Sequence, residues 1–229
     1  MKALILAGGR GKRLRPITDN IPKSLIQINK MPLIERSIKY LKKFGIDEII
    51  VCSGYRGKKI EDFLERKKNF GCKIIYSHEK TPLGTAGAIK NAMKYVSDES
   101  FVVINGDIIT NIDLRKILKK PNTIAANELK TKFGTMEIRN NKILKFNEKT
   151  DVENVWMNPG LYHLSGKIIK DLPNKGSLES LVFPKLVKRK SLHTVKFKNV
   201  LWHSIDSFKD IELCSKEIKL QKHVKFFKY

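Results

Sequence analysis

The chain opens with a short apolar run that passes directly into a glycine-rich, basic turn: residues 2–16 read KALILAGGRGKRLRP. The run Lys2–Ala7 predicts a fully buried strand. Gly8, Gly9 and Gly11 follow it at once, and glycine lets the backbone take up positive φ and lets a phosphate approach the main-chain N–H groups. Three arginines and a lysine in the same turn add mobile positive charge. The segment predicts a phosphate-binding loop, with an ordinary glycine turn and solvated arginines as the alternative. Neither the Walker A spacing nor the GxGxxG fingerprint is present.

The composition indicates a folded, well-solvated protein. Its 229 residues suit one large α/β domain, because 41% of them are apolar and 30% are charged. No apolar run approaches the roughly 18 residues that a membrane-spanning helix needs. The apolar stretch near the start is too short for a signal peptide, so we expect a cytoplasmic protein without a membrane partner.

The cysteines and histidines argue against several kinds of chemistry. Cys52, Cys72 and Cys214 lie far apart and form no CxxC pair, so we expect buried, reduced thiols. The histidines show no metal-ligand spacing, and no G-x-S-x-G nucleophile motif is present.

The net charge of +23 is large and raises the possibility of a nucleic-acid-binding protein. The basic residues are nevertheless spread over the whole chain, in short clusters such as Arg66-Lys67-Lys68 and Lys188-Arg189-Lys190. This distribution is typical of solvated helix faces. No nucleic-acid-binding motif with interleaved aromatic residues accompanies it, so we expect no specific nucleic-acid partner.

Hydrophobic periodicity in the first half alternates strands with amphipathic helices. Expected strands are Lys2–Ala7, Glu48–Cys52, Lys73–Tyr76 and Phe101–Asn105, and expected helices are Pro32–Phe44, Lys58–Lys67 and Ala86–Tyr95. This order is typical of a parallel sheet covered on both faces. Ligands of such sheets bind at the carboxyl ends of the strands.

The second half is richer in strands. Expected strands are Thr123–Asn127, Gly134–Arg139, Lys142–Asn147 and Trp156–Leu164, and expected helices are Leu178–Val187 and Ser207–Lys219. The Asn140-Asn141 pair predicts a hairpin turn. The whole pattern predicts an α/β, Rossmann-like, three-layer fold around a central mixed, mostly parallel sheet.

Two further segments suit phosphate chemistry at that edge of the sheet. The small-residue run Pro82–Ala88 leads into a helix N-terminus, a place that favours an anion or a base edge. Asp107 follows the apolar strand Phe101–Asn105, where a carboxylate beside a phosphate loop is well placed to hold Mg²⁺. The alternatives are a plain helix entry and a capping aspartate.

Together these motifs resemble those of the nucleoside-diphosphate-sugar pyrophosphorylases, or sugar-1-phosphate nucleotidyltransferases. The resemblance rests on LAGGRGKRLRP followed by Pro22-Lys23, and it continues along nearly the whole chain; Lys12 replaces the usual Thr. It implies that Arg13 and Lys23 stabilise the reacting phosphate. It also implies nucleotide contacts from two segments: Leu6, Ala7, Gly8, Gly9 and Gly11 in the first, and Pro82, Gly84, Thr85, Ala86 and Gly87 in the second.

The resemblance also implies a sugar-phosphate site in the second half. Glu148 and Lys149 match a Glu-Lys-Pro segment in which Glu contacts sugar hydroxyls and Lys binds the sugar phosphate as a third catalytic residue; Thr150 replaces the Pro. Asn158 matches an Asn-x-Gly-x-Tyr segment. The sugar-phosphate-binding residues implied in this way are Asn105, Gly134, Glu148, Lys149 and Asn158.

The family binds Mg²⁺ through two aspartates, and the resemblance implies Asp107 as the first. Many members place the second two residues after a Trp, where this chain has Ser204. Others place it four residues after the Trp, which is Asp206 here. Because positions 204 and 206 share one face of a strand, Asp206 is the expected second ligand.

The implied reaction joins a nucleoside triphosphate to a sugar 1-phosphate and releases pyrophosphate. The motifs favour GTP with mannose 1-phosphate or a manno-heptose 1-phosphate; CTP, UTP or dTTP with glucose 1-phosphate is the alternative, and a non-catalytic regulatory subunit is another. We expect one catalytic domain over residues 1–229, with 1–110 mainly binding the nucleotide and 111–229 mainly the sugar phosphate. No C-terminal β-helix domain is expected, and a homo-oligomer is left open.

Overall fold

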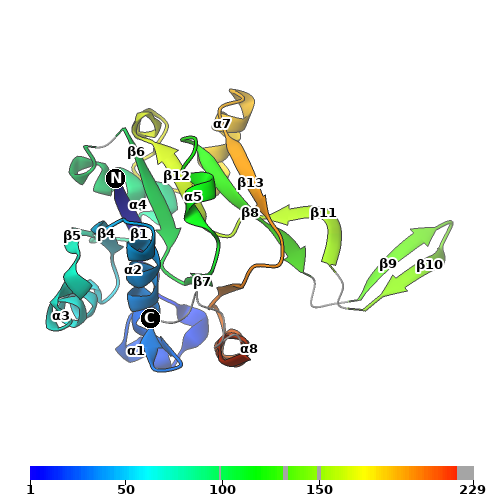
Figure 1. Cartoon of the computed structure of the whole chain (residues 1–229), viewed down its shortest axis with the longest axis horizontal. Helices are drawn as coiled ribbons and strands as arrows, with labels where there is room; N and C mark the ends of the chain where they lie inside the picture. The colour runs from blue at the N-terminus through cyan, green and yellow to red at the C-terminus, as the bar shows by residue number, and fades with distance from the viewer. Residues whose placement is uncertain (98, 131–133, 149–150, 221–229) are drawn as a thin grey trace.

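A mixed sheet forms the centre of the molecule. The computed structural model describes residues 1–97, 99–130, 134–148 and 151–220. Eight strands in these ranges form a sheet with the order β11-β8-β12-β6-β1-β4-β5, and β13 also pairs with β8 (Figure 1). The strands are β1 (Lys2–Ala7), β4 (Glu48–Ser53), β5 (Lys73–His78), β6 (Ser100–Asn105), β8 (Thr123–Lys130), β11 (Asp151–Met157), β12 (Leu161–Ser165) and β13 (His193–Phe197). β1 is parallel to both neighbours, with Leu4 opposite Ile50 and Val103, whereas β12 runs antiparallel to β6. The predicted mixed, mostly parallel sheet is confirmed.

Helices cover both faces of the parallel half, which completes three layers. Helices α2 (Leu33–Lys43) and α3 (Gly57–Arg66) pack on the face to which Ala3 and Ile5 point. Helices α4 (Gly84–Ala92), α6 (Leu178–Leu181) and α7 (Phe183–Lys188) pack on the opposite face, where Leu4 points. Because alternate residues of a strand point to opposite faces, a strand covered on both sides must be apolar throughout. This explains the continuous apolar run of β1.

The predicted strand Trp156–Leu164 is wrong as a continuous element, because Asn158, Pro159 and Gly160 interrupt it between β11 and β12. Pro159 has no N–H to donate to a neighbouring strand, and Gly160 has a φ of 77°. Met157 pairs with Asn127 and Tyr162 pairs with Ile124. The chain therefore advances five residues from β11 to β12 while β8 opposite advances only three. The interruption is thus a bulge.

The second half differs from the expectations in one helix and in one additional strand. The predicted helix Leu178–Val187 is two short helices, α6 and α7, which meet at Val182 just before Pro184. The strand β13 was not predicted at all. It pairs in parallel with β8, from His193 opposite Thr123 to Phe197 opposite Asn127, and only this nonlocal pairing identifies it.

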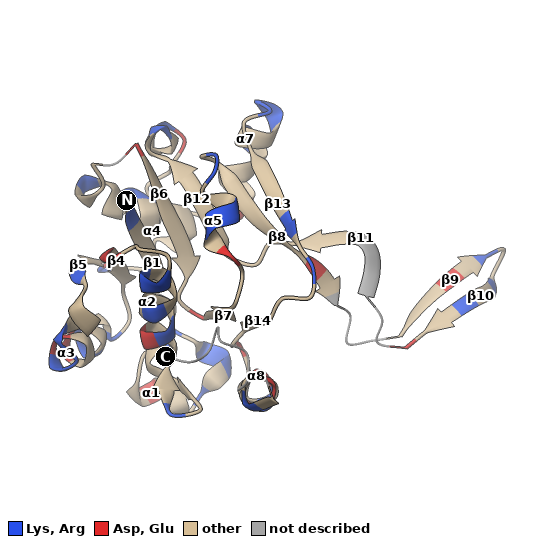
Figure 2. Ribbon diagram, in the orientation of Figure 1, with Lys and Arg blue, Asp and Glu red and all other residues tan. Residues whose placement is uncertain are grey.

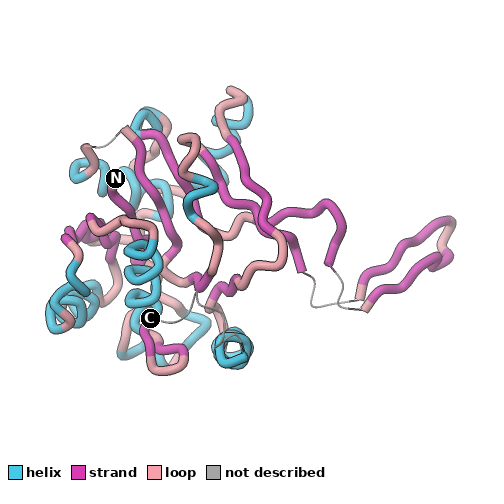
Figure 3. Tube along the Cα trace, in the orientation of Figure 1, coloured by secondary structure: helices cyan, strands magenta, loops and turns pink. Residues whose placement is uncertain are grey.

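The predicted hairpin is confirmed and projects from the body of the molecule (Figures 1 and 3). Its strands are β9 (Thr135–Arg139) and β10 (Lys142–Asn147). Asn140 and Asn141 have φ values of 49° and 61°, the left-handed pair that a tight two-residue hairpin turn requires. Among the described strands, β9 and β10 pair only with each other.

Short elements complete the fold beside the central sheet. Two-stranded ribbons join β7 (Ile108–Thr110) to β14 (Trp202–Ser204) and β2 (Gln27–Ile28) to β3 (Met31–Pro32). The remaining helices are α1 (Ile17–Asn20), α5 (Leu114–Ile117), α8 (Phe208–Leu220) and the 3₁₀ turns η1 (Lys12–Leu14), η2 (Lys23–Leu25), η3 (Lys68–Gly71), η4 (Met93–Tyr95) and η5 (Gly166–Lys170). In the described ranges no helix has the length and apolar character needed to cross a membrane.

The surface charge and the cysteines follow the expectations from composition. Basic side chains are distributed over helices on several sides of the molecule, α2, α3, α5 and α7 among them (Figure 2). Cys52, Cys72 and Cys214 are buried and unpaired by disulfides, as predicted. Burial raises the pKa of each thiol, which disfavours the reactive thiolate.

Candidate active site

The carboxyl ends of the parallel strands meet at one edge of the sheet and surround a cavity. β1, β4, β5 and β6 all end there, and the bulge at Asn158–Gly160 joins them because antiparallel β12 begins at the same edge. The cavity has a volume of about 290 Å³ and is lined by Leu6, Gly8, Gly9, Cys52, Glu79, Pro82, Gly84, Thr85, Ala88, Asn105 and Asp107. The structure thus brings together parts of both predicted nucleotide-binding segments with Asn105 and Asp107.

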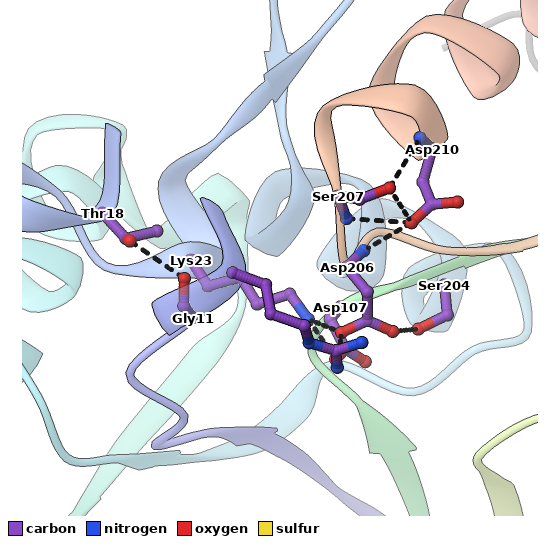
Figure 4. A network of polar contacts seen from close by, with 9 residues as sticks. Gly11, Thr18, Lys23, Asp107, Ser204, Asp206, Ser207 and Asp210 are labelled. Atoms are coloured by element: carbon purple, nitrogen blue, oxygen red, sulfur yellow. Dashed lines mark hydrogen bonds and ion pairs between the residues drawn. The ribbon is translucent and has the colours of Figure 1, made fainter. Parts of the chain in front are cut away.

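Two cations and two carboxylates meet at this edge (Figure 4). The Lys23 Nζ atom lies 2.7 Å from Asp107 Oδ2 and 2.8 Å from Asp206 Oδ1. Arg13 Nη2 also lies 2.8 Å from Asp206 Oδ1. The Lys23 side chain is only 12% exposed, whereas that of Arg13 is 76% exposed. The predicted phosphate-binding cations and the predicted metal-binding carboxylates therefore form one cluster.

Backbone pairing between distant segments creates this cluster. Ser204 of β14 pairs with Ile108 of β7, and one step further the Ile205 N–H donates to the Asp107 carbonyl at 3.0 Å. This pairing places Asp206 next to Asp107. On the other side of Asp107, the Gly106 N–H donates to the Leu6 carbonyl at 2.9 Å, and a Cβ on Gly106 would lie 2.7 Å from that oxygen. Only glycine allows the chain after β6 to approach the end of β1 so closely.

Asp206 is held in place by its own short loop. Its Oδ2 atom accepts a hydrogen bond from the Ser204 hydroxyl at 2.8 Å, and its N–H donates to Asp210 Oδ2 at 3.1 Å. Asp210 also accepts from the Ser207 N–H at 2.9 Å, at the start of α8. Burial raises the pKa of Asp206, but hydrogen bonds from Lys23 and Ser204 outweigh that effect and hold it below its usual value. Asp206 is therefore ionised at neutral pH, as the predicted metal-binding role requires.

The three predicted loop glycines differ in what surrounds them. Gly11 has a φ of 61°, and its carbonyl accepts a hydrogen bond from the Thr18 hydroxyl at 2.9 Å. A Cβ on Gly8 would lie 1.8 Å from Glu79 Oε1, whereas one on Gly9 would meet nothing within 4 Å. Gly9 therefore leaves an open approach to the loop, and Gly8 makes room for a carboxylate.

Glu79 is a cavity residue that the sequence reasoning missed. It follows β5 directly and is half-buried, with Oε2 accepting a hydrogen bond from the Leu83 N–H at 2.8 Å. Burial raises the pKa of Glu79, against smaller opposing effects of the Leu83 hydrogen bond and the His78 charge. Its place at the carboxyl end of a parallel strand was the available signal, because that position is where ligands bind in such sheets.

At the start of α4, the structure separates the predicted nucleotide-binding residues into two groups. Pro82, Gly84 and Thr85 line the cavity, and Gly84 has a φ of 74°. Ala86 is fully buried, and its N–H donates to the Gly176 carbonyl at 2.9 Å. A Cβ on Gly87 would lie 2.5 Å from the Asn174 carbonyl oxygen, so this glycine permits close packing against the 174–176 segment.

A second polar network connects α4 with the sugar-side residue Asn158. Glu179 accepts hydrogen bonds from the Thr85 hydroxyl at 2.8 Å and, at its other oxygen, from the Tyr162 hydroxyl at 3.3 Å. The Asn158 side-chain amide donates to the same Tyr162 hydroxyl at 2.9 Å. The Asn158 Oδ1 atom accepts from the Gly160 N–H at 2.9 Å. Glu179 therefore positions both Thr85, at an edge of the cavity, and, through Tyr162, the Asn158 amide.

The other predicted sugar-site residues lie in two places. Asn105 lines the cavity, and its buried Oδ1 atom has no hydrogen-bond partner within the described ranges, which a ligand donor would satisfy. Gly134 and Glu148 lie together at the base of the hairpin, where a Cβ on Gly134 would be 3.0 Å from Glu148 Oε2. Lys149 lies outside the described residues, so its predicted role stays a prediction.

Comparison with known proteins agrees with this geometry. The family model described as nucleotidyl transferase matches residues 2–219. A D-glycero-alpha-D-manno-heptose 1-phosphate guanylyltransferase from Aneurinibacillus thermoaerophilus is 37% identical over 170 residues, which cover 71% of this chain and 74% of the relative. The mannose-1-phosphate guanylyltransferase catalytic subunit beta of Dictyostelium discoideum is 34% identical over 224 residues, 92% of this chain and 62% of the relative.

A solved structure shares the fold over nearly the whole chain. HddC from Yersinia pseudotuberculosis, complexed with GMP-PN, has a TM-score of 0.74 and 30% identity, and the match covers 95% of this chain and 99% of that one. The predicted Rossmann-like, three-layer α/β fold is thereby confirmed. From the family model over residues 2–219, these likenesses and the cluster at the cavity, it follows that the chain belongs to the nucleotidyl transferase family and is a sugar-1-phosphate nucleotidyltransferase.

Proposed function

We propose that the enzyme uses Mg²⁺ and GTP to transfer a guanylyl group to a manno-configured sugar 1-phosphate, with a manno-heptose 1-phosphate or mannose 1-phosphate as the acceptor. The single observation that carries the choice of base is the Glu79 carboxylate in the wall of the glycine-lined cavity. The guanylyltransferase names of the relatives support the same choice.

Hydrogen-bonding chemistry explains why a carboxylate favours guanine. An ionised carboxylate only accepts hydrogen bonds, and it accepts a parallel pair best. Guanine presents two adjacent donors, N1–H and the 2-amino group. Uracil and thymine flank their one ring N–H with two carbonyl oxygens, which a carboxylate repels, and cytosine and adenine place an acceptor beside their amino group. Glu79 therefore both attracts guanine and disfavours the other bases.

The cation cluster accounts for the phosphate chemistry. A sugar 1-phosphate is already ionised at neutral pH, so it needs no general base to attack the α-phosphorus in line. The obstacle is repulsion between two anions together with the charge of the leaving pyrophosphate. Lys23 and Arg13 stabilise that negative charge with their positive side chains. The backbone N–H dipoles of the Gly8, Gly9 and Gly11 loop add to this stabilisation.

The donor set fits a magnesium ion. Asp107, in the turn between β6 and β7, and Asp206, in the loop between β14 and α8, converge on one point, which the Lys23 ammonium occupies. Mg²⁺ is commonly held by one or two carboxylates together with substrate phosphates. Asp107 and Asp206 would hold the ion, which would supply charge neutralisation for the phosphates. Lys23 would contact the phosphates of the nucleotide.

Asn105 and Asn158 are the residues we assign to hydroxyl recognition. The unpartnered Asn105 Oδ1 atom requires a donor, and a sugar or ribose hydroxyl supplies one. The Asn158 amide is oriented by the Tyr162 hydroxyl at the same edge of the sheet. The resemblance adds Gly134, Glu148 and Lys149 to the sugar side.

A matrix of substrates tests this proposal. Pyrophosphate release is measured with GTP, CTP, UTP and dTTP against mannose, manno-heptose and glucose 1-phosphates, each with and without Mg²⁺. We expect kcat/KM for GTP to exceed that for the other nucleotides by roughly 100-fold, as is typical when a polar site rejects a mismatched base. Equal or faster turnover with a pyrimidine nucleotide would overturn the assignment of the base, and full activity in EDTA would overturn that of magnesium.

A further inference from the structure

The cross-strand pairs of the projecting hairpin are apolar on one face and polar on the other. Ile138 pairs with Ile143 and Met136 with Phe146, and these two cross-strand pairs lie on one face because they are two residues apart on β9. The pairs on the other face are polar: Thr135 with Asn147, Glu137 with Lys145 and Arg139 with Lys142.

Nothing in the described part of the chain covers the apolar face. Met136 is 51% exposed, Ile143 is 58% exposed, and Ile138 and Phe146 are each 60% exposed. Leu144, the extra residue at the register shift between Ile143 and Lys145, is also 58% exposed. An isolated two-stranded hairpin is at best marginally stable in water. It needs further strands or another element packed against its apolar face. Five large apolar side chains in one projecting segment therefore indicate an interaction surface.

We propose that this apolar face packs against the same face of a second copy of the chain. Such a contact is self-complementary: a twofold axis stacks two identical apolar faces and leaves both polar faces in water. The four paired side chains and Leu144 at the register shift together expose on the order of 500 Å² per copy, so full burial of all of them in two copies would remove about 1,000 Å² in total, the lower size of a specific interface.

The charge of the hairpin favours a copy of itself over a polyanion. Residues 134–148 contain two acidic residues, Glu137 and Glu148, and three basic ones, Arg139, Lys142 and Lys145. Their sum of +1 contrasts with +23 for the whole chain. A surface for nucleic acid or an acidic membrane would concentrate positive charge, whereas a contact between two copies of a strongly basic protein must avoid it. The hairpin is such a near-neutral segment.

The contact also bears on the sugar side of the active site, a consequence that rests on the proposed function. Gly134 and Glu148, which the resemblance assigns to the sugar, lie at the base of this hairpin. A hairpin held against its counterpart keeps that base in one place. Loss of the contact should therefore raise KM for the sugar 1-phosphate several-fold and leave KM for the nucleotide unchanged.

A charge-neutral double variant tests the contact directly. Ile138→Glu with Ile143→Lys replaces an apolar cross-strand pair by an oppositely charged one, which preserves hairpin pairing while it removes the apolar face. The matched control, Glu137→Lys with Lys145→Glu, exchanges the charges of a cross-strand pair on the polar face. Neither variant alters the net charge. Molar mass is measured by light scattering over a concentration series.

We expect the wild type and the control to have twice the chain mass. The dissociation constant of the dimer should be roughly 100-fold higher or more in the Ile138→Glu, Ile143→Lys variant. A monomeric wild type, or a dimer that both double variants retain equally, would overturn the proposal. The mass measurement needs no substrate, so its failure is distinct from failure of the proposed function.

A cross-linking experiment gives a readout that does not depend on loss of the dimer. The three native cysteines are buried, so a cysteine introduced at Ile138 is the reactive one. We expect mild oxidation of Ile138→Cys to give a disulfide-linked dimer and oxidation of Glu137→Cys, on the polar face, to give none. Equal cross-linking of both variants, or of neither, would contradict a twofold contact through the apolar face.

Discussion

Lys23 and Asp107 form an ion pair at 2.7 Å across 84 positions of sequence, and the ammonium of Lys23 lies where two carboxylates converge. The lysine is thus an internal counter-ion for the two carboxylates. Under the proposed function, the carboxylates bind the metal and the same lysine contacts the nucleotide. Variants of Asp107 and Lys23 should therefore change both metal binding and turnover.

Replacing Asp107 with Asn should lower kcat/KM by roughly 30- to 1000-fold, because one charge contact in the transition state is worth about 2–4 kcal/mol. Pyrophosphate release measures the effect. The matched control is Asp113→Asn, whose carboxylate pairs with the exposed Arg115 and caps α5. The control should stay within about twofold of wild type. Near-normal turnover of Asp107→Asn would remove Asp107 from the mechanism.

Replacing Lys23 with Met should have opposite effects on metal binding and on turnover. Without the ammonium, Asp107 and Asp206 repel each other, so the protein should lose about 1–3 kcal/mol of stability in the absence of divalent ions. Mg²⁺ no longer competes with Lys23 and should bind more tightly to the free protein, while kcat falls.

Thermal unfolding with increasing Mg²⁺ measures the stability and the metal binding of Lys23→Met, and pyrophosphate release measures its kcat. The stabilisation by Mg²⁺ should be larger in the variant than in the wild type, because a ligand that binds only the folded state stabilises it more the tighter it binds. The exposed Lys68→Met is the control. A variant that Mg²⁺ stabilises no more than wild type would argue against Lys23 as the counter-ion of a metal site.

Glu79→Gln should reduce kcat/KM for GTP by roughly 30- to 100-fold, because a neutral amide replaces the paired acceptor that guanine requires. Turnover with the other nucleotides should change little. Glu65→Gln, on the exposed side of α3, is the control. Selectivity for GTP that is unchanged in Glu79→Gln would show that another group reads the base.

The pH dependence of GTP binding supplies an independent test of Glu79. Burial raises the pKa of this carboxyl, and only its ionised form accepts two donors. As the pH falls through that raised pKa, KM for GTP should rise, beginning at a higher pH than an ordinary glutamate would give. In Glu79→Gln this acid limb should be absent. An identical acid limb in both proteins would assign it to a different group.

Glu179→Ala should raise KM for the sugar 1-phosphate about 10-fold and affect KM for the nucleotide less. The alanine leaves the hydroxyls of Thr85, Ser177 and Tyr162 without their acceptor and so releases the Asn158 amide. Glu179→Gln retains a carbonyl acceptor and should recover part of the loss. Ser180→Ala, at the neighbouring exposed position, is the control. Equal KM changes for both substrates would indicate general loss of structure instead of misplacement of Asn158.

Much of the fold was predictable from local patterns. The strands of the parallel half and the helices that cover them were expected within a few residues of where they lie. The hairpin turn at Asn140 and Asn141 was expected as well. The errors in the strands occurred where pairing partners are distant: β13 is defined by β8, and the bulge at Asn158–Gly160 is defined by the shift in register against β8. The error in the helices was local, because the predicted helix Leu178–Val187 breaks at Val182, just before Pro184. The division into a nucleotide half and a sugar-phosphate half remains a prediction.

The amino-acid sequence alone specified those features whose cause is local: a doubly buried strand through its unbroken apolar run, and the tight turn after it through its glycines. The resemblance supplied predicted roles for Arg13, Lys23, Asp107 and Asp206. Tertiary structure alone brought Lys23 to Asp206, 183 positions away, because a hydrogen bond from the Ile205 N–H to the Asp107 carbonyl extends the pairing of β14 with β7. It also revealed Glu79 and Glu179, whose importance comes from burial beside the cavity and from partners that no short stretch of sequence contains.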